Sequence, residues 1–98
     1  MAGNTGNDLI TVDGGFVDDD VLGNEGADTI SIAGAASIGD NVEGNSGSDT
    51  IVMTGGLVGS SGGDGDLLGN DGDDQMTVTG GTVTHDVEGN SGADTISV

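Results

Sequence analysis

One ten-residue pattern recurs five times in this chain and limits its possible folds more than any other feature. The pattern is G-N-x-G-x-D-x-U-x-U, where U is apolar, and its copies start near residues 3, 23, 44, 69 and 89. Self-similarity at a fixed period is typical of solenoids, in which each repeat buries its apolar face only against its neighbours. We therefore treat residues 1–98 as a single repeat domain.

Apolar and polar residues alternate after each motif Asp, as expected for a strand with one buried face. Residues 29–32, for example, read Thr-Ile-Ser-Ile. A weaker motif between the copies supplies further apolar residues, so we interpret each repeat as two half-turns, each a glycine turn followed by a short strand. The third weak motif carries extra residues around 59–63, which accounts for one longer spacing. The expected inward pairs are Ile10/Val12, Ile30/Ile32, Ile51/Met53, Met76/Val78 and Ile96/Val98, together with Val17/Val21, Ile38/Val42, Val58/Leu67 and Val83/Val87.

The composition excludes several classes of function. The chain has 18 acidic residues and no Lys or Arg, so we expect it to bind neither nucleic acid nor anionic lipid. It has no Cys, which excludes disulfides and thiolate metal sites. No apolar run approaches the roughly 18 residues of a membrane span, and the first residues do not resemble a Sec signal peptide. High net charge with low hydrophobicity favours disorder, and only the repeat argues for a fold.

Stacked repeats would bring the motif Asp residues into one acidic column. Equivalent residues of adjacent coils lie ~4.8 Å apart, and two carboxylates at that distance repel by about 1 kcal/mol even in water. Such a column destabilises itself unless cations bind to it. Carboxylate and glycine-turn carbonyl oxygens suit Ca²⁺, whereas Mg²⁺ demands a tighter octahedron and transition metals prefer His or Cys. The column consists of Asp8, Asp28, Asp49, Asp74 and Asp94.

The motif resembles the calcium-binding nonapeptide of the RTX (repeats-in-toxin) family, G-G-x-G-x-D-x-U-x. The resemblance covers nearly the whole chain, although Asn replaces the second Gly in all five copies. The period of about 20 residues is similar to that of the extended RTX repeats of large bacterial adhesins. The resemblance implies an all-β protein, a right-handed parallel β-solenoid (β-roll) of about five coils that binds several Ca²⁺ ions between its turns.

The resemblance also implies a set of ligands. The motif Asp carboxylates would bind Ca²⁺ together with backbone carbonyls of the glycine-rich turns. The implied carbonyl donors are Gly3, Gly6, Gly23, Gly26, Gly44, Gly47, Gly69, Gly72, Gly89 and Gly92. The Asn residues at the family's Gly position suit either a left-handed turn conformation or a stacked amide ladder. They are Asn4, Asn24, Asn45, Asn70 and Asn90.

A second polar column precedes the glycine turn and consists of Asp20, Asn41, Asp66 and Asp86. Two interpretations are open: these residues complete the calcium sites from the other side, or they form a solvated face that keeps the coils soluble. His85 occupies the repeat position of Asp19 and Asp40 and is interpreted as a solvated or locally paired residue. No nucleophile with a plausible partner accompanies it, so we do not expect an enzyme.

The function predicted from these features is that of a calcium-binding structural module that folds on binding Ca²⁺. It would serve as a spacer or rigidifying segment of a secreted bacterial adhesin, toxin-like protein or surface protein, located outside the cell. The chain is expected to be a piece of a longer array, with neighbouring repeats as partners. One alternative is a self-assembling filament or surface-layer component whose coils stack through open strand edges. Ice binding is a weaker alternative, because the Thr and Asn ranks are irregular.

Overall fold

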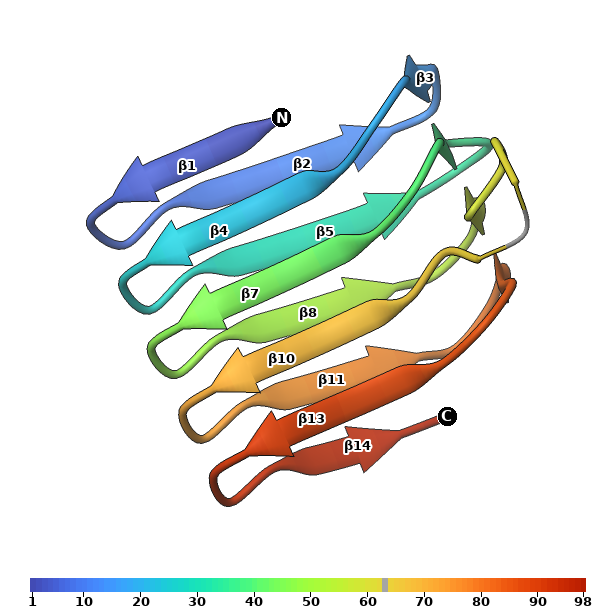
Figure 1. The fold of residues 1–98 in the computed structure, drawn as a ribbon. Coiled ribbons are helices and arrows are strands. Elements are labelled where there is room, and N and C mark those ends of the chain that lie inside the picture. The colour runs from blue at the N-terminus through green and yellow to red at the C-terminus, as the bar shows by residue number, and fades with distance from the viewer. Residues whose placement is uncertain (63) are drawn as a thin grey trace.

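The protein is a β-solenoid in which three parallel sheets run along the stack of coils (Figure 1). The computed structural model describes residues 1–62 and 64–98, which form fourteen strands and no helix. Sheet A contains β1 (Ala2–Thr5), β4 (Val21–Glu25), β7 (Val42–Ser46), β10 (Leu67–Asp71) and β13 (Val87–Ser91). Sheet B contains β2 (Leu9–Asp13), β5 (Thr29–Ala33), β8 (Thr50–Met53), β11 (Gln75–Val78) and β14 (Thr95–Ser97). Sheet C contains β3 (Phe16–Val17), β6 (Ser37–Ile38), β9 (Leu57–Val58) and β12 (Thr82–Val83). The predicted all-β solenoid of about five coils is therefore confirmed.

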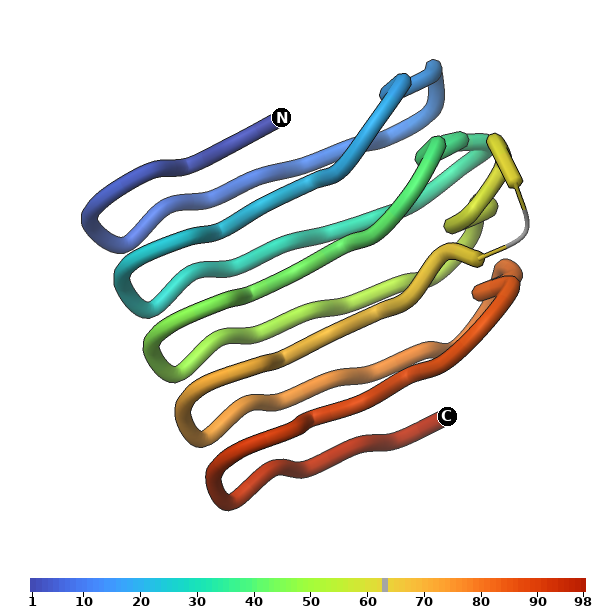
Figure 2. The backbone as a smooth tube through the Cα atoms, in the orientation of Figure 1, coloured from blue at the N-terminus to red at the C-terminus, as the bar shows by residue number. Residues whose placement is uncertain are grey.

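Equivalent residues of successive repeats pair directly with each other across the coils. In sheet B, Ile10 pairs with Ile30, Ile30 pairs with Ile51, and Ile51 pairs with Met76. The insertion does not disturb this register, because its described residues, 59–62, lie between β9 in sheet C and β10 in sheet A (Figure 2). Residue 63, the last of the predicted insertion, lies outside the described residues. A column of identical repeat positions thus runs the length of the molecule.

Each of the first four coils contains three strands, and the last contains two, where the sequence predicted two half-turns. The strand after the motif Asp was predicted correctly and forms sheet B. The first Gly and the Asn of the motif, however, lie in a strand of sheet A, and the turn begins only at the second Gly, as at Gly26. Val17 and Val21 consequently belong to different strands, β3 and β4. The chain bends between them, so their side chains enter the core from two sheets.

The predicted inward residues form one apolar core in the middle of the stack. Ile30, Ile32, Ile51 and Met53 have no exposed surface, and Val21, Ile38, Val42, Val58 and Leu67 are equally buried. Burying one such side chain contributes about 1.5–3 kcal/mol, so the stacking of neighbouring coils holds the fold together. In the last coil, where no further coil covers them, Ile96 and Val98 are 43% and 86% exposed.

In the part of the chain that the structure describes, no helix has the length and apolarity that crossing a membrane requires.

Candidate metal centre

The motif Asp residues lie inside the turn that connects sheet A to sheet B, one per coil. These turns stack at the left of Figure 1. Asp28, Asp49 and Asp74, in the three inner coils, are each only 1% exposed. Fully buried Asp is rare in proteins unless it is paired, so the partners of these carboxylates decide what the column can do.

In every coil after the first, one oxygen of the motif carboxylate accepts a hydrogen bond from the preceding coil. The backbone N–H of Asp8 donates to Oδ1 of Asp28 at 2.7 Å, and that of Asp28 donates to Oδ1 of Asp49 at 2.8 Å. The same bond recurs from Asp49 to Asp74 at 2.8 Å and from Asp74 to Asp94 at 3.0 Å. These four carboxylates therefore lean toward the coil that precedes them, which links adjacent coils by a side-chain ladder.

The other oxygen of the carboxylate has no such partner. Among the described residues, Oδ2 of Asp8, Asp28, Asp49 and Asp74 is buried and accepts no hydrogen bond. Leaving a buried polar atom unsatisfied costs about 1–3 kcal/mol, and more when the group is charged. Four such atoms in one column are a repeated feature of the fold, and a proton or a cation at each Oδ2 would remove the penalty.

The unpartnered oxygen lies against the first Gly of its own motif, five residues earlier in the sequence. An ideal Cβ added to Gly23 would lie 2.5 Å from Asp28 Oδ2 and 2.7 Å from the carbonyl oxygen of Gly44 in the next coil. Gly3 has the same surroundings, with Asp8 Oδ2 at 2.6 Å and the Gly23 carbonyl oxygen at 2.9 Å from that position. A carboxylate oxygen and a carbonyl oxygen from adjacent coils therefore converge on a small space that only Gly leaves open.

Charge accumulates in this column. Burial raises the pKa of Asp49 and of Asp74 above the ordinary value, although each accepts a hydrogen bond from the backbone of the preceding coil, which lowers it. The neighbouring carboxylates raise both pKa values further, with Asp28 and Asp74 acting on Asp49. Buried carboxylate and carbonyl oxygens are the hard donors that Ca²⁺ takes. The residues present thus fit a calcium ion.

The second Gly of each motif has a different role from the first. Gly26, Gly47, Gly72 and Gly92 have φ between 128° and 132°, in the region that disfavours any residue with a side chain. A Cβ on any of them would collide with the carbonyl oxygen of the turn glycine in the preceding coil. The ten predicted carbonyl donors therefore divide into two groups: the first glycines lie beside the motif carboxylates, and the turn glycines stack on one another.

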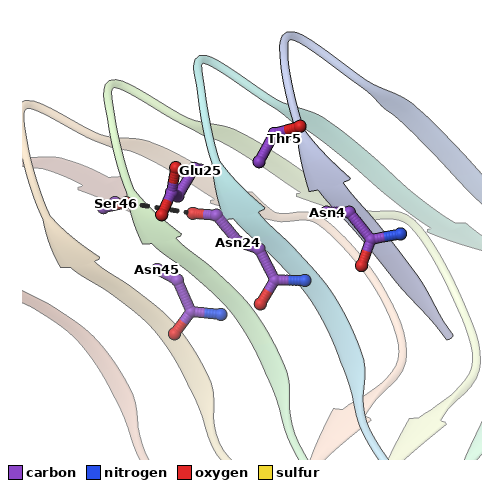
Figure 3. A pocket seen from close by; sticks show the side chains of 6 residues that line it. All are labelled: Asn4, Thr5, Asn24, Glu25, Asn45 and Ser46. Carbon is purple, nitrogen blue, oxygen red and sulfur yellow. Dashed lines mark hydrogen bonds between the residues drawn. The ribbon is translucent and has the colours of Figure 1, made fainter.

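The Asn column adopts the left-handed conformation at all five positions, and its last three members also form an amide ladder. All five residues have positive φ, between 68° and 82°. The side chain of Asn70 donates to that of Asn45 at 3.3 Å, and Asn90 donates to Asn70 at 3.2 Å. Asn4, Asn24 and Asn45 project from the outer face of sheet A, where they line a shallow groove with Thr5, Glu25 and Ser46 (Figure 3). The Asn residues thus lie on the opposite face of the sheet from the buried core.

Replacing Asn70 separates the contribution of the left-handed backbone conformation from that of the amide hydrogen bonds. Asn70→Ala is expected to destabilise the fold by about 1–2 kcal/mol, because an L-residue without the amide is strained at this φ and three side-chain hydrogen bonds are lost, those with Glu43, Asn45 and Asn90. Asn70→Gly keeps the backbone conformation and should lose less. Urea unfolding midpoints of both variants measure the difference. Equal losses for Ala and Gly would show that the left-handed φ contributes nothing.

The second polar column also forms a ladder, but in the opposite direction. Asp20 Oδ1 accepts from the N–H of Asn41, Asn41 Oδ1 from that of Asp66, and Asp66 Oδ1 from that of Asp86, each at 2.9 Å. A five-residue strand of sheet A, about 16 Å long, separates the two columns in each coil. The second column therefore cannot complete the sites of the first, as one interpretation of the sequence required.

The site could be identified only in part from the sequence. The Asp column follows directly from the repeat, whereas its contact with the first Gly was not predicted. The available signal was the constant separation of five residues between that Gly and the motif Asp in all five copies.

No family model matches the chain, and no curated protein or solved structure matches it either. The resemblance to RTX repeats accordingly rests on the motif alone. The metal centre is defined by the carboxylate and carbonyl oxygens that converge beside the first glycines.

Proposed function

We propose that this protein is a calcium-binding structural module whose fold is stabilised by several Ca²⁺ ions bound along the motif Asp column. One observation carries the proposal: each inner coil holds a fully buried Asp with one oxygen unpartnered. The residues that would hold the ions are Asp8, Asp28, Asp49, Asp74 and Asp94, with carbonyls of the glycines beside them. Bound Ca²⁺ would neutralise the column and satisfy the free oxygens.

The mechanism is linkage between binding and stacking. The oxygens that converge beside Gly23 come from two adjacent coils, so an ion there would bind the stacked chain and not the extended one. A ligand that binds only the folded state stabilises it by mass action, by about 2.7 kcal/mol for each site at 100 times its Kd. With a net charge of −18, the chain also repels itself when no cation is bound.

We infer a role as a spacer or rigidifying segment of a secreted bacterial adhesin, toxin-like protein or surface protein. The motif's resemblance to RTX repeats supports this wider role. So does the register, which continues from coil to coil and suits a longer array. In such a protein the module would be unfolded at low Ca²⁺ inside the cell and folded outside.

The test is far-UV circular dichroism of chelator-stripped protein during a calcium titration, with Mg²⁺ as the control ion. We expect a coil-to-β transition with Ca²⁺ and little change with Mg²⁺ at the same concentration. A full β spectrum in chelator that Ca²⁺ neither changes nor stabilises against urea would overturn the proposal. Light scattering recorded in parallel distinguishes a folding monomer from coils that associate end to end.

A further inference from the structure

A mixed cluster of nitrogen and oxygen donors lies in the second polar column, away from the motif Asp site. His85 Nδ1 is 2.7 Å from Asp66 Oδ1 and 3.4 Å from Asp86 Oδ2. The three donor atoms, from two adjacent coils, all lie within 4.8 Å of one another. His85 is the only His in the sequence, and its side chain is 55% exposed, so an ion from solvent can reach it.

The spacing of these donors suits a small divalent ion. Zinc bonds to nitrogen and oxygen ligands of about 2.0–2.1 Å place neighbouring donors roughly 2.9–3.4 Å apart in octahedral or tetrahedral geometry. The two distances at His85 lie close to this range. Calcium bonds are longer, and calcium takes oxygen ligands only. An imidazole beside two carboxylates therefore favours a borderline transition metal over Ca²⁺.

The backbone ladder holds one of these ligands in place. Asp66 Oδ1 accepts the N–H of Asp86 at 2.9 Å, which fixes its carboxylate relative to the next coil. Hydrogen bonds of this kind orient metal ligands and strengthen binding. At the same corner of an earlier pair of coils, Asp19, Asp20 and Asp40 form a similar cluster with carboxylates alone. The difference between the two clusters is the imidazole, which makes the later one distinct from a solvated acidic face.

We propose that His85, Asp66 and Asp86 form a surface site for Zn²⁺ or a similar transition-metal ion, independent of calcium binding by the motif Asp column. Three protein ligands leave at least one coordination position open for water. The competing explanation is that His85 only forms a hydrogen-bonded pair with Asp66, in which case added zinc would not engage the ring.

The experiment is a Zn²⁺ titration of the full chain followed by NMR of the imidazole and by calorimetry. Because there is one His, its ring signals report on this site alone. Circular dichroism first establishes conditions above the pKa of His85 under which the chain is folded, with Ca²⁺ present where the stripped chain is unfolded, because only a neutral imidazole binds a metal. The zinc result then holds whether or not calcium drives folding. We expect the ring signals to shift and saturate at one equivalent of Zn²⁺, and to be unaffected by Mg²⁺.

His85→Asp is the matched variant, since it restores the residue type found at this position in earlier coils. It also makes the chain more acidic, so non-specific attraction of Zn²⁺ would increase. If the site exists, His85→Asp and Asp66→Asn should each weaken the one-equivalent binding at least about tenfold. Unshifted ring signals, or zinc binding by His85→Asp as tight as that of the parent chain, would overturn the proposal.

Discussion

Asp28→Asn is expected to stabilise the protein in chelator and to weaken its response to calcium. The Asn Oδ1 can still accept the N–H of Asp8, so the ladder survives. Its Nδ2 replaces a buried, unpartnered carboxylate oxygen with a donor beside the Gly44 carbonyl. The substitution removes the unpartnered oxygen and one buried charge. It should therefore raise the free energy of unfolding without calcium by about 1–3 kcal/mol.

With calcium bound, Asp28→Asn should instead be less stable than the parent chain, because one carboxylate ligand has been lost from the column. We expect the Ca²⁺ concentration at the midpoint of stabilisation to rise about tenfold, which corresponds to roughly 1.4 kcal/mol. Asp13→Asn is the matched control, since it removes one exposed charge from outside both columns. A calcium titration measures the second effect, and urea unfolding in chelator measures the first; where the stripped chain is unfolded, the fraction folded by circular dichroism replaces the urea midpoint. A variant that is less stable than the parent chain in chelator, or that responds equally to Ca²⁺, would show that Asp28 is a structural ladder residue only.

Stability without calcium is expected to fall as the pH rises from 5 to 7.5. Burial and neighbouring carboxylates raise the pKa of Asp49 and Asp74, so the folded chain holds these protons more tightly than the unfolded chain does. Burial, followed by the charge of Asp20, raises the pKa of Glu43 in the same direction. For such groups the stabilisation is complete below their unfolded pKa, near 4, and is lost as the pH rises through the folded value.

Two other groups change the size of this effect but not its direction. The hydrogen bond that His85 Nδ1 donates to Asp66 Oδ1 raises the pKa of His85, so its contribution is complete below the unfolded value, about 6.5, and is also lost as the pH rises. The backbone N–H of Asp86 lowers the pKa of Asp66, whose contribution is present above its unfolded pKa and lost only in more acidic solution. The window from pH 5 to 7.5 therefore reports mainly on the groups whose pKa values are raised.

Urea midpoints in chelator at several pH values measure this loss. Where the stripped chain is unfolded at neutral pH, the fraction folded by circular dichroism replaces the midpoint. Saturating Ca²⁺ should reverse the trend, since calcium competes with protons for the same oxygens and binds better as they ionise. Stability in chelator that rises across this window would contradict the raised pKa values of the buried Asp residues.

Much of the fold could be predicted because its signals are local and repeat. Alternation after the motif Asp identified sheet B, and the fixed spacing aligned Ile30 with Ile51 across coils. The division of the first four coils into three strands each was not predicted. Gly and Asn usually indicate a turn, yet here the pair Gly23-Asn24 lies in a strand, since Asn24 pairs with Asn45 in spite of its left-handed φ.

The sequence by itself determined the class of fold, the period of the coils and the existence of an acidic column, because each depends on residue types at regular intervals. Only the tertiary structure decided which oxygens of that column are free. That outcome depends on the direction of the ladder. In every coil after the first, Oδ1 of the motif Asp accepts a backbone N–H at least 20 residues away, and Oδ2 is left beside a glycine. The same kind of long-range contact brings His85 to Asp66, because stacking sets residues from different coils side by side.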